Sequence, residues 1–95
     1  GNQKAPGSRV VAYVNHDQKI VFVNPETLPP LPADKTYQMW SDVEGEMIDM
    51  GLLDSKRNLI ELKYIEAAES LNITIEPAGG NAHPTVADLV SYVTL

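Results

Sequence analysis

The sequence predicts an all-β domain, an antiparallel β-sandwich of the immunoglobulin-like type with about seven short strands and at most one short helical turn. Short segments rich in β-branched and aromatic residues recur along the chain, and polar or glycine-containing turns separate them. A length of 95 residues suits one domain and leaves no room for a second core. We expect an irregular lead-in over residues 1–8 and one sandwich domain over residues 9–95.

The first two strands are expected over residues 9–15 and 19–24, where valine, isoleucine, tyrosine and phenylalanine are concentrated. The three polar residues His16-Asp17-Gln18 separate them, so the two strands should pair as an antiparallel hairpin.

Four prolines then mark a connector, at positions 25, 29, 30 and 32. Proline fixes φ near −65° and cannot donate to a strand ladder, so an extended, unpaired segment is expected. Pro29 and Pro30 would form its rigid centre, while Leu28 and Leu31 hold it against the core. Such a connector suits a crossing from one sheet to the other.

The later strands follow the same rules, and a turn at Gly45 separates the first two of them. Leu71, Ile73 and Ile75 alternate with polar residues and predict one buried strand face. Helix-forming residues at 66–70 could close one helical turn. The expected strands are residues 36–42, 47–53, 59–64, 71–76 and 89–95.

A tight turn ends the strand at 71–76, where the sequence reads Pro77-Ala-Gly-Gly80. We interpret Pro77, Gly79, Gly80 and Pro84 as structural turn residues, with the two glycines at positive φ. A phosphate-binding loop would need a following Lys-Ser/Thr and a long helix, and the sequence has neither.

Reactive groups are sparse. The two histidines, His16 and His83, lie alone in predicted turns, and a zinc site needs three or four ligands. The acidic cluster of Asp42, Glu44, Glu46 and Asp49 lacks the spacing of a calcium-binding EF-hand loop and suits a solvated turn. The chain has no cysteine, which excludes disulfides and thiolate chemistry. We therefore expect no enzyme activity, no cofactor and no metal.

The net charge of −6 disfavours binding to nucleic acids and to anionic membrane surfaces. No apolar segment approaches the ~20 residues that span a bilayer. A membrane anchor would therefore lie outside these residues.

Trp40 leaves two alternatives open. Strand alternation places Tyr37 and Met39 on one face and Gln38 and Trp40 on the other. If the first face is the core, then only the second sheet, a loop or a partner can cover Trp40, so its ring either packs within the domain or contacts a partner or ligand. Tyr13 is the second candidate for a partner contact.

Two segments carry a family resemblance: the first signature, residues 28–40, and the second signature, residues 74–85. They contain Leu28-Pro-Pro-Leu-Pro, Lys35-Thr-Tyr-Gln-Met-Trp40, and Ile75-Glu-Pro-Ala-Gly-Gly80 followed by Pro84-Thr85. In this order they resemble the extracytoplasmic C-terminal domain of the anti-sigma-K factor family, and Gly51 matches a glycine embedded in a middle strand. The sequence departs from the family pattern at Met39, at Asn81 and after Thr85.

The resemblance implies a bacterial membrane-anchored regulator. A cytoplasmic domain, absent from this chain, would hold an extracytoplasmic-function sigma factor, and an upstream transmembrane helix would link it to this domain on the periplasmic side. A regulatory protease or a periplasmic protein would be a further partner.

The alternative is an exported β-sandwich module that binds an extracellular protein or a carbohydrate, with Trp40 and Tyr13 as contact residues.

Overall fold

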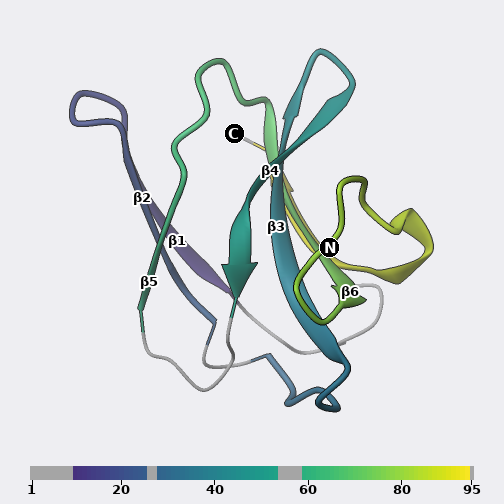
Figure 1. Cartoon of the computed structure of the whole chain (residues 1–95). Helices are drawn as coiled ribbons and strands as arrows, with labels where there is room; N and C mark the ends of the chain where they lie inside the picture. Colours follow the sequence, from purple (N-terminus) through teal and green to yellow (C-terminus); the bar gives the residue numbers. More distant parts are fainter. Residues whose placement is uncertain (1–9, 26–27, 54–58, 95) are drawn as a thin grey trace.

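The computed structural model describes residues 10–25, 28–53 and 59–94, and it consists of two antiparallel sheets that face each other (Figure 1). The smaller sheet has the order β1 (Val11–Asn15), β2 (Ile20–Asn24), β5 (Ile60–Leu62). The larger sheet has the order β4 (Glu46–Leu53), β3 (Lys35–Val43), β6 (Ser70–Pro77), β7 (Leu89–Thr94). The predicted β-sandwich is confirmed. Its strand order is that of an immunoglobulin-type sandwich in which the fourth strand joins the sheet of the third, sixth and seventh.

The predicted helical turn at residues 66–70 is wrong. Ala67 has a φ of 61°, in the left-handed region, and this conformation interrupts a right-handed turn. Backbone bonds from Lys63 N to Met50 O and from Glu69 N to Asp42 O tie both ends of this segment to the larger sheet. Within the described ranges, a 3₁₀ turn, η1 (Val86–Asp88), lies directly before β7 instead.

The hydrophobic core lies between the sheets. The strand alternation places Tyr37 and Met39 in it, as expected, together with Leu71 and Ile73 from β6. Leu28 is buried, so the proline-rich connector is held against the core while it crosses from β2 to β3. The core residues are Val21, Val23, Leu28, Tyr37, Met39, Met50, Leu53, Leu62, Leu71, Ile73 and Val90.

A second layer covers the outer face of the larger sheet. The segment from Ala78 to Asp88 connects β6 to β7 and loops beside the β3–β6 pair (Figure 1). Four buried polar side chains lie on this face, opposite to the core: Gln38, Asn72, Thr74 and Glu76. Their burial requires hydrogen-bond partners, since an unpaired buried polar group costs about 1–3 kcal/mol.

No helix in the described part of the chain is long and apolar enough to cross a membrane.

Candidate functional site

The central feature of the outer face is a pair of hydrogen bonds between the two signatures. Asn81 N donates to Gln38 Oε1 at 2.9 Å, and Gln38 Nε2 donates to the carbonyl of Asn81 at 3.1 Å. Gln38 Nε2 also donates to Asp49 Oδ1 at 2.8 Å. The amide of Gln38 thus pairs with the backbone of a residue 43 positions away, as another strand would.

Glu76 anchors the same loop with a buried carboxylate, which is 1% exposed. Its oxygens accept hydrogen bonds from the backbone N and the hydroxyl of Thr85, both at 2.7 Å. Thr74 Oγ1 and Asn81 Nδ2 donate to it as well. Burial alone would raise the pKa of Glu76, but these hydrogen bonds outweigh it and hold the pKa below its usual value. The carboxylate therefore stays charged and holds the loop.

Trp40 lies in this layer and is fully buried, at 0% exposure. Its indole Nε1 donates to Thr74 Oγ1 at 2.9 Å, and Thr74 passes the hydrogen bond on to Glu76. The partner-contact alternative for Trp40 does not fit this position, because the ring has no exposed surface. Packing under a second layer describes it. In antibody domains a conserved buried tryptophan lies in the core between the sheets, whereas Trp40 lies on the opposite face of β3.

Asp49 supports the layer from β4, a role that the sequence did not reveal. The pairing of β3 with β4 shifts register between Met39 and Trp40, so Met50 is an extra residue. Asp49 Oδ1 accepts from Gly51 N at 2.9 Å across this bulge and receives the Gln38 amide as well. The sequence signal for an irregular strand was the glycine at position 51, inside the strand expected over residues 47–53. In the structure Gly51 has a φ of 130°.

We call these seven residues the polar layer: Gln38, Trp40, Asp49, Thr74, Glu76, Asn81 and Thr85.

The predicted turn residues lie around the polar layer. Pro77 ends β6, and its carbonyl accepts from Gly80 N at 2.9 Å. Gly79 and Gly80 have φ values of 93° and 90°, the positive φ that the turn predicts. Pro84 is half-buried in the loop that Glu76 anchors.

In the connector, Pro29 and Pro30 are exposed. The carbonyl of Pro29 accepts a hydrogen bond from the hydroxyl of Tyr37 at 2.6 Å.

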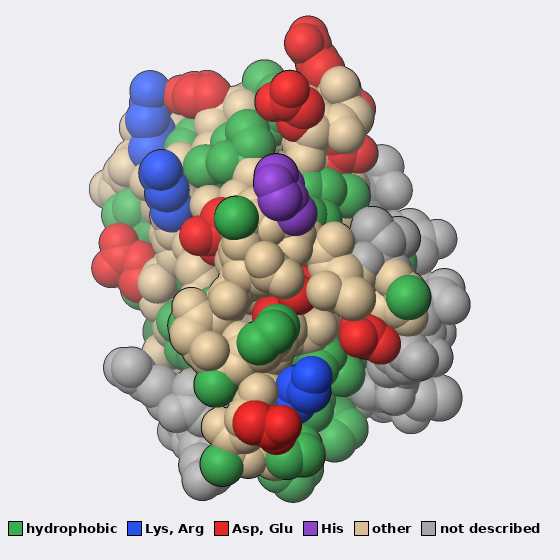
Figure 2. All heavy atoms as spheres, turned by 45° about the vertical axis from the view of Figure 1, so that its right-hand side comes forward, with side chains coloured by type: hydrophobic (Ala, Val, Ile, Leu, Met, Phe, Trp, Pro, Cys, Tyr) green, Lys and Arg blue, Asp and Glu red, His purple; other side chains and the backbone are tan. Residues whose placement is uncertain are grey.

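The polar layer shows no sign of a reactive or metal-binding site among the described residues. Among the described residues, no buried side-chain nitrogen or oxygen lacks a hydrogen-bond partner. The described histidines, aspartates and glutamates include no group of three or more that could hold a metal ion. On the face shown in Figure 2, acidic side chains are spread among hydrophobic and neutral ones and form no single patch. The layer therefore suits a scaffold that fixes the loop.

Tyr13 lies far from this layer, on the smaller sheet. It is 60% exposed and pairs in register with Phe22 of β2. The structure brings no other predicted site residue to it, and its role as a contact residue stays a prediction.

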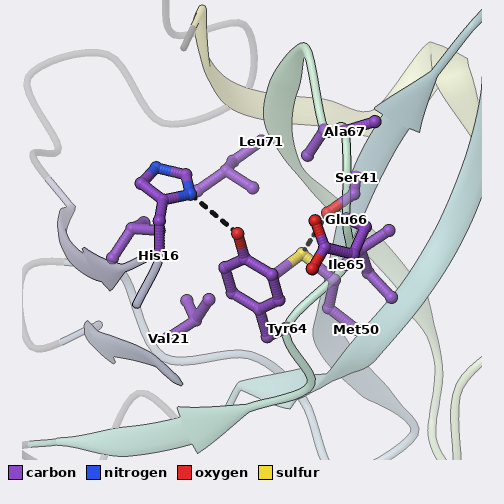
Figure 3. A pocket seen from close by; sticks show the side chains of 11 residues that line it. His16, Val21, Ser41, Met50, Tyr64, Ile65, Glu66, Ala67 and Leu71 are labelled. Carbon is purple, nitrogen blue, oxygen red and sulfur yellow. Dashed lines mark hydrogen bonds between the residues drawn. The ribbon is translucent and has the colours of Figure 1, made fainter. Parts of the chain in front are cut away.

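A pocket of about 190 Å³ lies between the two sheets (Figure 3). His16 from the β1–β2 turn reaches Tyr64, and the Nδ1 and Oη atoms are 2.7 Å apart. Ser41 lies in its wall from β3 and donates to Met50 Sδ at 2.8 Å. The sequence placed His16 alone in a turn, because its partner is 48 residues away.

Comparison with known proteins agrees with the family resemblance of the two signatures. The chain belongs to the family described as "Anti-sigma-K factor rskA, C-terminal", which matches residues 1–89. A relative from Streptomyces griseus, "Uncharacterized protein in phr 5'region", is 36% identical over 83 residues. That match covers 83% of this chain and 34% of the relative, so the chain spans well under half of the relative's length. No solved structure matches the chain.

Proposed function

We propose that this chain is the extracytoplasmic regulatory domain of a membrane-anchored bacterial anti-sigma factor, which negatively regulates an extracytoplasmic-function sigma factor. The observation that carries the proposal is the family match over residues 1–89. The polar layer supports it, because the two signatures of the resemblance meet there and serve to hold a fold.

In this proposal the sigma-binding domain and the transmembrane helix lie outside these 95 residues. The domain itself would act as a stably folded outer module. While folded, it would limit the access of a regulatory protease to the stalk near the membrane, and its loss would release the sigma factor. A periplasmic protein that alters its stability would change the same output.

A reporter gene that depends on the sigma factor tests this function in the full-length protein. Deletion of residues 10–95 should change reporter activity, and Trp40→Ala should change it in the same direction because it destabilises the domain. Ala33→Leu is the matched control, since Ala33 is exposed in a turn. An unchanged reporter after the deletion, under every stress applied, argues against a regulatory role.

The proposed location has a separate test. Alkaline phosphatase fused after the last residue should be active, because this enzyme matures only outside the cytoplasm. Fractionation should recover the fusion with the membrane. An inactive fusion contradicts the extracytoplasmic location.

A second candidate function is an exported module that binds an extracellular protein or a carbohydrate. The exposure of Tyr13 and Val11 on the smaller sheet favours it, at 60% and 42%. Recovery of the natural protein in the medium rather than in the membrane fraction would support this candidate over the first.

A further inference from the structure

The pocket between the sheets has walls of mixed chemistry. Val14 and Val21 come from the smaller sheet, and Met50 and Leu71 come from the larger one. The segment from Tyr64 to Ala68 closes one side, and it is fixed at both ends by backbone bonds to the larger sheet. Polar atoms are present from the fully buried Ser41 out to the exposed Glu66 (Figure 3). The pocket therefore offers apolar contact area together with a few fixed polar groups, which is typical of small-molecule sites.

The size of the pocket sets the size of its ligand. An engineered protein cavity of about 150 Å³ takes up benzene. The volume here is about 190 Å³, so it can hold one six-membered ring with a small substituent.

The charges around the pocket select a neutral ligand. Its lining includes the carboxylate of Glu66 and no lysine or arginine, and its one histidine, His16, is bound to Tyr64 Oη, so an anion finds no free countercharge there. Lys19 Nζ lies 2.7 Å from Glu66 Oε1, and this ion pair neutralises the carboxylate, which leaves little attraction for a cation.

The hydroxyl of Tyr64 selects a ligand that donates a hydrogen bond. Ser41 is fully buried and its hydroxyl donates to Met50 Sδ, so a ligand cannot reach it. Tyr64 is only partly buried, and its Oη has acceptor capacity left when its proton goes to His16 Nδ1. A ligand hydroxyl can donate to this oxygen.

We propose that this pocket binds a small, neutral, hydroxyl-bearing ring compound of the phenol class. The ring packs between Val21, Met50 and Leu71, and the hydroxyl donates to Tyr64 Oη. The proposal rests on the pocket alone, so it stands or falls independently of the regulatory function.

Phenol and toluene are the probes, titrated into the ¹⁵N-labelled 95-residue chain and followed by NMR. Phenol should cause saturable shifts that are confined to residues lining the pocket. Ala68→Leu places three more carbon atoms in the pocket and should weaken phenol binding at least tenfold. Ala33→Leu adds the same atoms at an exposed turn and should leave binding unchanged.

Tyr64→Phe separates recognition of the hydroxyl from simple filling of the cavity. This variant should weaken phenol binding about threefold to tenfold, in line with one lost hydrogen bond, and leave toluene binding unchanged. Non-saturating or scattered shifts would overturn the proposal, and so would phenol binding that Ala68→Leu does not weaken. Equal effects of Tyr64→Phe on both probes would overturn the assigned role of the Tyr64 hydroxyl.

Discussion

Trp40 Nε1 donates a hydrogen bond to Thr74 Oγ1, and this contact joins the first signature to the second across the β3–β6 pair. The same threonine donates to Glu76, which holds the loop through Thr85. A buried ring, a hydroxyl and a carboxylate thus form one chain of hydrogen bonds on the outer face of the sheet. Stability should depend on each link.

Replacement of Trp40 by alanine should lower the free energy of unfolding by about 3–5 kcal/mol, because it removes a fully buried ring and leaves a cavity. Urea unfolding monitored by circular dichroism measures this change. Tyr13→Ala, which removes an exposed ring, serves as the control and should cost far less. A loss below about 1 kcal/mol for Trp40→Ala would contradict its place in the polar layer.

Glu76 should make stability depend on acid pH. Its pKa is lower in the folded state than in the unfolded chain, so its contribution is complete above the unfolded value, near 4.5. That contribution is lost as the pH falls through the lower, folded value. Glu76→Gln should cost about 1–3 kcal/mol at neutral pH and flatten the decline in stability below pH 4.5. Unfolding midpoints measured from pH 3 to 7 check both effects, and an unchanged acid profile would rule out this role of the carboxylate.

Gly80 and Gly79 form a matched pair for testing how closely the loop packs. Both have positive φ, so alanine at either position should cost about 1–2 kcal/mol from backbone strain. A Cβ at Gly80 would also lie 2.9 Å from Leu52 Cδ2 and 3.1 Å from Gln38 Oε1, whereas one at Gly79 meets nothing within 4 Å. Thermal unfolding should therefore show a larger loss for Gly80→Ala than for Gly79→Ala. Equal losses would mean that the loop does not pack against Gln38 as described.

Tyr37 should affect stability at alkaline pH. Burial raises the pKa of its hydroxyl above the usual 10, so the folded state retains this proton longer than the unfolded chain does. Its contribution is complete below pH 10 and is lost as the pH rises through the folded value. Tyr37→Phe should cost about 0.5–1.5 kcal/mol at pH 7, since the bond to Pro29 is lost. The variant should lose less stability than the parent above pH 10, and a parallel decline of the two would contradict this role.

Alternation and turn chemistry were enough to predict the seven strands, because both act over a few neighbouring residues. The predictions failed where contacts between residues distant in the sequence determine the local backbone conformation. The helical composition at 66–70 is overridden by tethers to Met50 and Asp42, both on other strands. The bulge at Met50 could not be predicted from a pattern of period two, since one inserted residue shifts every later side chain to the other face.

The site was harder to predict than the fold for the same reason. The sequence did identify both signatures and left the burial of Trp40 open. It could not show that Gln38 pairs with Asn81, because only the folded sheets bring the two together. His16 and Tyr64 are also too far apart in sequence for any local pattern to connect them.

The attachment of the loop to Gln38 and Glu76 also determines how this loop opens. Surface loops usually exchange their amide hydrogens with solvent through small local fluctuations. Here the amides of Asn81 and Thr85 bind side chains of the two central strands, so exposing them requires separation of β3 and β6 from their covering layer. In deuterated water these two amides should exchange as slowly as those in the middle of the sheet. The surface loop that carries Asn81 and Thr85 would then unfold together with the central strands of the larger sheet, in the last cooperative unit of the molecule to open.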